Sequence, residues 1–169
     1  MLVLVTNVDE FKNRGVLVKE IVKFHPSITT VVQNINKRHT NVILGEKERV
    51  LYGKGFIKDS ILGVDFNISS KSFYQVNPIQ VEKLYSKAIE YAQLSMENTV
   101  IDAYCGIGTI GLIASKYCKQ VYGVEIVKEA IEDAKHNASI NNIINVKFDC
   151  DDASKYMLNF NEQNIKTDT

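Results

Sequence analysis

The feature that most limits the fold of this chain is a glycine-rich loop between a predicted strand and a predicted helix. The loop places Gly106, Gly108 and Gly111 in a GxGxxG pattern after the apolar strand at 99–104. Glycines at this spacing let the backbone approach a nucleotide closely, at the amino terminus of the helix that follows. Glu125 ends the next predicted strand, 19 residues after Gly106, where an acid can accept ribose hydroxyl groups. Strand, loop, helix, strand and acid in this order predict a nucleotide-type ligand, whereas the glycines alone would also fit a tight turn.

Helices and strands alternate throughout the second half of the chain. Pro78 suits the first turn of a helix, and apolar residues recur at helical spacing from Val81 to Ala92. The segments that follow the glycine loop are expected to be a helix at 110–117, a strand at 120–125, a helix at 128–141, a strand at 145–150 and a final helix at 152–160. This alternation with short loops is typical of a parallel α/β sheet.

The first 76 residues have a different pattern, in which short β-branched segments follow a single predicted helix. A short apolar strand at 2–6 precedes an amphipathic helix at 11–24, which the His25-Pro26 pair ends. The β-branched segments that follow are expected to be strands at 28–34, 41–44, 49–53, 61–68 and 73–76. Glycines between them indicate antiparallel hairpins. We therefore expect an α+β lobe at 1–76, a cofactor-binding domain at 77–160 and a loose polar tail at 161–169.

Charge is divided unevenly between the two halves. The chain has 169 residues, with 20 Lys and Arg balancing 20 Asp and Glu. Residues 1–80 hold eleven basic and seven acidic residues, and residues 81–169 hold nine and thirteen. The zero net charge argues against a protein that coats nucleic acid generally. The basic first half is consistent with RNA as a partner, and chance variation in surface charge is the alternative explanation of the excess.

Cysteine usage and hydropathy indicate a cytoplasmic protein. The three cysteines (Cys105, Cys118 and Cys150) form neither a CxxC pair nor a disulfide framework, and they make no metal set with the histidines. No apolar run approaches the roughly 18 residues that cross a bilayer, and a signal peptide is not expected.

Acidic residues near the glycine loop help to identify the nucleotide. Asp102 lies beside the loop, where it would repel the pyrophosphate of a dinucleotide and attract the ammonium and sulfonium groups of S-adenosylmethionine. Asp149, Asp151 and Asp152 follow the third strand, near where an adenine amino group would lie. A nicotinamide-dinucleotide oxidoreductase remains the alternative of a different class, and capping the next helix remains an alternative role for Asp152.

Several segments together resemble the RNA uracil-5-methyltransferases, the family of 23S ribosomal RNA and tRNA uracil-C5 enzymes. The resemblance covers about residues 2–158. It rests on the loop Asp102-Ala103-Tyr104-Cys105-Gly106-Ile107-Gly108-Thr109, the upstream segment Ser72-Phe73-Tyr74-Gln75-Val76-Asn77-Pro78, and the lobe segments Asn34-Ile35-Asn36 and Thr40-Asn41-Val42-Ile43-Leu44-Gly45. It implies the first half of a Rossmann-like methyltransferase sheet, S-adenosylmethionine as cofactor, and ribosomal or transfer RNA as substrate.

The resemblance also implies which residues bind the cofactor. Gln75 matches the glutamine that contacts the methionine part, Glu125 the ribose-binding acid, and Asp152 a polar position near adenine. The remaining cofactor positions are those of the glycine loop, namely Asp102, Tyr104, Gly106, Gly108 and Thr109. Thr109 departs from the asparagine of some members. Packing in the core is an alternative role for Tyr104, and simple exposure on a strand is an alternative for Gln75.

The catalytic segments of that family do not occur in this chain. In the family a cysteine thiolate adds to C6 of uracil, which activates C5 for methylation, and a base then removes the C5 proton. The chain has no Asp-Pro-Pro-Arg or Ser-Cys-Asn-Pro-like segment, since its prolines are Pro26 and Pro78. We therefore expect a fragment that is inactive alone, with a sheet whose 3-2-1 half leaves the strand at 99–103 with an open edge. Self-association through that edge is the expected consequence. A methyltransferase for another substrate and a non-catalytic binding module remain alternatives.

Overall fold

The chain forms two compact units in a computed structural model that describes residues 1–162 and 167–168. Unit 1 comprises residues 1–57 and 69–71, and unit 2 comprises residues 58–68 and the chain from residue 72 onward. Residues 58–68, which the sequence assigns to the first lobe, thus lie in unit 2. The loose tail expected at 161–169 falls mainly outside the described residues, although the last helix continues through Glu162.

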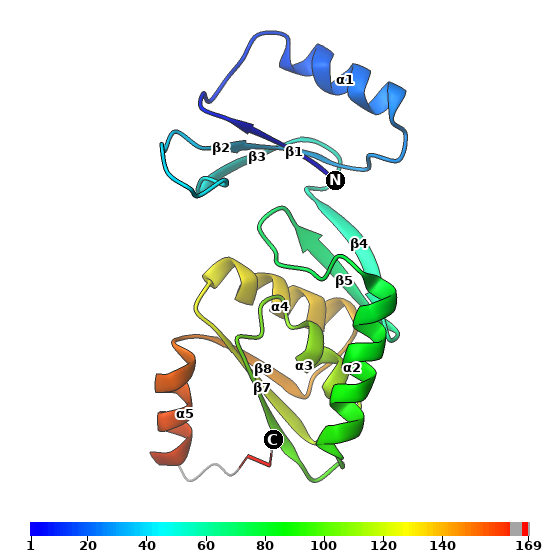
Figure 1. Cartoon of the computed structure of the whole chain (residues 1–169), viewed down its shortest axis with the longest axis vertical. Coiled ribbons are helices and arrows are strands. Elements are labelled where there is room, and N and C mark those ends of the chain that lie inside the picture. Colours follow the sequence, from blue (N-terminus) through cyan, green and yellow to red (C-terminus); the bar gives the residue numbers. More distant parts are fainter. Residues whose placement is uncertain (163–166, 169) are drawn as a thin grey trace. The chain divides into compact units, whose positions relative to one another are not determined.

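Unit 1 is a three-stranded sheet with one helix (Figure 1). Its elements are β1 (Leu2–Thr6), α1 (Arg14–Phe24), β2 (Val31–Ile35) and β3 (Lys47–Tyr52), with strand order β1-β2-β3. β2 and β3 pair antiparallel, as the sequence predicts, but β1 and β2 pair parallel through the α1 crossover. The central strand β2 is buried along its whole length.

The structure corrects two strand predictions, at residues 61–68 and 73–76. The run expected as one strand at 61–68 begins at the last residue of β4 (Phe56–Ile61), turns at Leu62 and Gly63, which have positive φ angles, and continues as β5 (Val64–Ser69), which pairs with β4. Residues 73–76 form no strand and lead into α2 (Pro78–Ala92). The side chain of Asn77 caps this helix by accepting a hydrogen bond from the Gln80 N–H at 3.2 Å.

The rest of unit 2 is a parallel α/β sheet, which confirms the Rossmann-like fold class (Figure 1). Its elements in chain order are β6 (Thr99–Ala103), α3 (Thr109–Ala114), β7 (Gln120–Glu125), α4 (Lys128–Ile140), β8 (Val146–Cys150) and α5 (Ala153–Glu162). The strand order is β6-β7-β8, and both pairs of neighbours are parallel. This is the half-sheet that the resemblance implies.

Alternating residues of the sheet build a core on each of its faces. On one face Val100 and Val121 pack with residues of and just after α3. On the other face Val124 packs with α5, whose Tyr156 and Phe160 are buried. Strand alternation thus fixes β6 and β7 between two helical layers, which holds the carboxyl ends of the strands in place. Among the described residues, no helix is both long and apolar enough to cross a membrane.

Candidate cofactor site

The carboxyl ends of the three parallel strands meet at one edge of the sheet. Ala103 lies opposite Val124, and Glu125 lies opposite Cys150. The loop after β6 and the acid that ends β7 are therefore neighbours, although 19 residues separate Gly106 from Glu125. In open α/β sheets, ligands bind in the crevice outside these strand ends.

The glycine loop is a tight turn that is tied to the neighbouring strand. Tyr104, Gly106 and Gly108 have positive φ angles of 62°, 55° and 81°. The Cys105 N–H donates to the Val124 carbonyl at 3.0 Å, and the Gly108 N–H donates to the Cys105 carbonyl at 2.9 Å. These bonds fix the path of the loop before α3 begins.

The two glycines of the turn are needed for different reasons. A side chain at Gly108 would place its Cβ 2.7 Å from the ring of Phe148 and 3.3 Å from the Cβ of Ala134, so this position packs the loop against α4 and β8. A Cβ at Gly106 would meet nothing within 4 Å, so the backbone there is open on its outer side. Open space beside a loop backbone is what close approach of a nucleotide requires.

Glu125 connects the end of β7 to the loop. Its Oε2 accepts a hydrogen bond from the Gly106 N–H at 3.3 Å, and its Oε1 accepts from the Ile126 and Val127 N–H groups at 2.8 and 3.1 Å. The carboxylate is half-buried and oriented by backbone groups on both sides. An ionised carboxylate offers about four acceptor positions, so it retains capacity for hydroxyl donors of a ligand.

Asp102 is tied to the first turn of α3 by a hydrogen bond. Its Oδ2 accepts from the Gly111 N–H at 2.9 Å, and burial raises the pKa of this carboxyl to about 7. At neutral pH the group is then only partly ionised, so it attracts a cationic ligand less than the sequence suggests. Its contact satisfies a backbone donor in the first turn of α3, which is a structural role.

The other expected site residues have varied surroundings. Tyr104 is 73% exposed at the turn, so its ring is not core. The Thr109 hydroxyl hydrogen-bonds the Tyr85 hydroxyl at 3.2 Å, and Gln75 is half-buried in the segment before α2. Exposed Asp152 caps α5 by accepting from the Lys155 N–H at 3.1 Å, which is the alternative role weighed for it.

Asn137 is a site-supporting residue that sequence reasoning does not identify. It is fully buried on α4, where its Oδ1 accepts from the Asn67 N–H at 2.9 Å and its Nδ2 donates to the Ile107 carbonyl at 3.4 Å. The amide thus ties the glycine loop to β5. Its signal is an amide within an otherwise apolar helical stripe that includes Ala134 and Ala138.

Burial disfavours two of the three cysteines as nucleophiles. Cys105 and Cys118 are buried, and burial raises the pKa of each thiol, with the Asp102 and Glu125 charges adding to the effect at Cys105. Cys150 is exposed, and its thiol faces the Ile126 carbonyl at 3.5 Å. A raised thiol pKa suppresses the reactive thiolate. The described residues also contain no group of three or more His, Cys, Asp or Glu that could hold a metal ion.

Residues 94–168 match the family model described as a methyltransferase domain. The whole chain is similar to curated bacterial proteins. An uncharacterized RNA methyltransferase of Oceanobacillus iheyensis is 47% identical over 168 residues, and one of Staphylococcus aureus (strain MSSA476) is 48% identical over 168 residues. Each alignment covers 99% of this chain and 37% of the relative, so the chain spans little more than a third of their length.

Solved structures show the same fold. The Pyrococcus abyssi tRNA (uracil-54, C5)-methyltransferase in complex with S-adenosyl-L-homocysteine matches with a TM-score of 0.66 and 26% identity, over 87% of this chain and 34% of that one. A SAM-dependent methyltransferase of Agrobacterium tumefaciens matches with a TM-score of 0.59 and 17% identity, over 86% of this chain and 46% of that one. The fold is that of S-adenosylmethionine-dependent methyltransferases. The curated relatives named above carry the description RNA methyltransferase.

Proposed function

We propose that this chain is the cofactor-binding part of an S-adenosylmethionine-dependent enzyme that methylates C5 of uridine in ribosomal or transfer RNA. The observation that carries the proposal is the Glu125 carboxylate, which is oriented by the Gly106 amide beside an open loop backbone. The similarity to RNA methyltransferases supports RNA as the substrate. The uracil-5 specificity is supported by the resemblance of the Gln75 segment and by the Pyrococcus relative.

The site fits S-adenosylmethionine by its shape and its donors and acceptors. Glu125 accepts the ribose hydroxyls, Gly106 leaves room for the ligand, and the exposed ring of Tyr104 covers one side of it. Gln75 contacts the methionine part, and Asp152 lies near the adenine. The bound cofactor supplies a methyl group on a positively charged sulfur, which makes that carbon an electrophile.

Catalysis by this chain alone is not part of the proposal. Cys105 and Cys118 are buried with raised thiol pKa values, and the chain contains none of the cysteine or base segments of the uracil-5 enzymes. The chain therefore binds and positions the cofactor, and we propose that it transfers no methyl group by itself.

The role of Glu125 can be tested by calorimetric titration of the chain with S-adenosylhomocysteine. Glu125→Ala removes the acceptor for the ribose hydroxyls and should weaken binding about tenfold or more, since hydrogen bonds to charged groups contribute roughly 1.5–3 kcal/mol. Glu97→Ala removes an exposed carboxylate from the turn before β6 and is the matched control. Equal affinities of wild type and Glu125→Ala would remove Glu125 from the site.

A further inference from the structure

Side-chain hydrogen bonds from two asparagines hold the exposed loop between β2 and β3 in unit 1. Asn34 is fully buried, and its side chain bonds the backbone of Gly45 in both directions, accepting from the N–H at 2.6 Å and donating to the carbonyl at 3.0 Å. A Cβ at Gly45 would lie 2.1 Å from the Ile35 carbonyl oxygen, so only glycine fits this closure. The base of the loop is therefore fixed from inside the unit.

A second asparagine shapes the loop itself. Asn36 Nδ2 donates to the carbonyls of Val42 and Ile43 at 2.7 and 2.9 Å, and its Oδ1 accepts from the Arg38 N–H at 3.0 Å. These bonds replace strand pairing, so the segment expected as a strand at 41–44 is a loop. We call residues 37–43, which this asparagine holds in place, the loop tip.

The loop tip presents donors and apolar groups but no acid. All seven residues are exposed, and the sequence is Lys-Arg-His-Thr-Asn-Val-Ile. Val42 and Ile43 are 53% and 75% exposed. Cationic and hydroxyl or amide side chains bind phosphates, and unstacked bases stack on histidine rings and arginine guanidinium planes, which His39 and Arg38 supply beside the exposed apolar side chains. This combination fits a single-stranded or looped nucleic acid better than a regular duplex.

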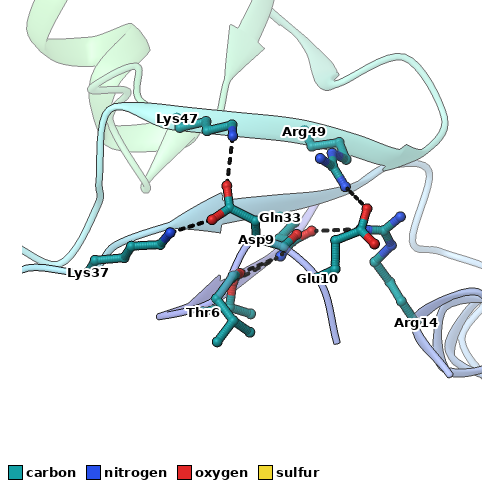
Figure 2. A network of polar contacts seen from close by, with 9 residues as sticks. Thr6, Asp9, Glu10, Arg14, Gln33, Lys37, Lys47 and Arg49 are labelled. Atoms are coloured by element: carbon teal, nitrogen blue, oxygen red, sulfur yellow. Dashed lines mark hydrogen bonds and ion pairs between the residues drawn. The ribbon is translucent and has the colours of Figure 1, made fainter. Parts of the chain in front are cut away.

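The nearby carboxylates hold the basic side chains in reach without neutralising them permanently. Asp9 bridges Lys37 and Lys47, and Arg38 pairs with Glu46 (Figure 2 shows the first pair of contacts). The two lysine ammonium groups lower the pKa of Asp9 to about 2, so this acid stays ionised. These ion pairs are exposed to solvent, and exposed pairs contribute little to stability, so the basic side chains are able to exchange a carboxylate for a phosphate.

The polar pocket beside the loop does not bind the phosphate itself. Its lining includes Asp9 and Glu46 along with Lys37, Arg38 and Lys47, and two carboxylates would repel an anion seated within it. The phosphate backbone is therefore placed across the exposed tip. The charge of the whole unit agrees, because unit 1 carries ten Lys and Arg against five Asp and Glu, a net charge of +5.

We infer that the loop tip at residues 37–43 binds the sugar–phosphate backbone of a single-stranded segment of RNA. The inference rests on the proposed function for the nature of the nucleic acid, and it adds the surface that holds it. Lys37 and Arg38 contact phosphates, while Val42 and Ile43 pack against bases.

The test measures binding of a fluorescein-labelled oligouridylate to the full chain by fluorescence anisotropy over a range of salt concentrations. The double variant Lys37→Ala/Arg38→Ala should weaken binding roughly five- to tenfold and reduce the slope of log affinity against log salt by about 1.4, since two phosphate contacts are lost. The matched control Lys19→Ala/Lys23→Ala removes two basic residues of α1 from the same unit and should retain the wild-type slope. The charge-conserving variant Lys37→Arg/Arg38→Lys should also retain it, which separates loss of charge from misfolding.

The same preparations are titrated with S-adenosylhomocysteine to keep this inference apart from the proposed function. The double variant should bind the cofactor as wild type does. Equal RNA affinity and salt slope in the double variant and wild type would overturn the loop assignment and leave the methyltransferase proposal standing. Wild-type chain that binds the cofactor but no RNA would overturn the loop assignment as well, while loss of cofactor binding in wild type would contradict the proposed function instead.

Discussion

The contacts of individual residues around the glycine loop explain why motif and structure agree only in part. The nearness of Glu125 to the turn at Gly106 and Gly108 could be predicted, because a glycine loop and an acid at this spacing meet at the carboxyl ends of parallel strands. The hydrogen bond from the Gly111 N–H to the Asp102 carboxylate could not, because sequence order does not encode the direction of that side chain. Burial rather than a neighbouring charge then sets its pKa.

This buried carboxyl predicts a pH dependence of stability. In the folded chain the pKa of Asp102 is raised to about 7 from an ordinary value of 3.8, so the folded state binds this proton more tightly than the unfolded state does. Its contribution to the free energy of unfolding is therefore greatest below about pH 4 and falls as the pH rises to about 7. Asp102→Asn keeps an acceptor for the Gly111 N–H without the charge, and it should remove this part of the dependence.

Urea unfolding of wild type and Asp102→Asn between about pH 4 and about pH 8 measures the effect. At the alkaline end the variant should be more stable by up to about 4 kcal/mol, which is the shift in pKa expressed as free energy. Parallel curves for the two proteins across this range would show that ionised Asp102 costs the fold nothing.

Most helices and strands follow from local sequence patterns, but in some segments side chains from elsewhere in the chain determine the backbone conformation. The alternation at 78–160 predicts α2 to α5 and β6 to β8 because helical spacing and buried strand runs have different periods. Residues 41–44 have a strand-like β-branched run, yet the Asn36 side chain bonds the carbonyls of Val42 and Ile43, and Asn34 fixes Gly45 directly after them, so the segment is a loop. The turn at Leu62 could not be predicted, because leucine rarely adopts a positive φ angle and its presence does not indicate a turn.

The strand β6 lies at an edge of its sheet, so only one of its sides pairs with another strand among the described residues. β7 pairs with one of its sides, and on the other side Asp168 bonds Thr99, with the Thr99 N–H donating to the Asp168 carboxylate and the Asp168 N–H donating to the Thr99 carbonyl, each at 2.9 Å. Beside β6 lies an apolar groove of about 290 Å³ between α2 and α3, lined by residues such as Ile89, Ala92 and Ile110. An unpaired strand edge beside an apolar groove favours addition of another chain.

We therefore expect the chain to self-associate through this edge. Light scattering should show a mass that rises with protein concentration. Ala92→Lys places a charge in the groove lining and should shift the equilibrium toward monomer, whereas Tyr91→Lys changes the neighbouring residue of α2, which is exposed and outside the lining. A monodisperse wild-type monomer at all concentrations would contradict the expectation, as would equal effects of the two substitutions.

In the whole molecule, charge divides along the boundary between the two units. Unit 1 has a net charge of +5, and unit 2, with ten Lys and Arg against fifteen Asp and Glu, has a net charge of −5. A basic unit suits an RNA backbone, and an acidic unit suits a cofactor that carries an ammonium and a sulfonium group. The overall balance of 20 against 20 conceals this division. The difference in net charge is larger between the two units than between residues 1–80 and 81–169, because residues 58–68 of the β4–β5 hairpin belong to unit 2.

We propose that unit 2 binds S-adenosylmethionine and not a dinucleotide. Parallel calorimetric titrations of the wild-type chain with S-adenosylhomocysteine and with NAD test it most directly. We expect saturable binding of S-adenosylhomocysteine and weaker or undetectable binding of NAD, because residues 102–111 contain no Lys or Arg to pair with a pyrophosphate and the Glu125 carboxylate beside the loop repels one. Tighter binding of NAD than of S-adenosylhomocysteine would contradict it.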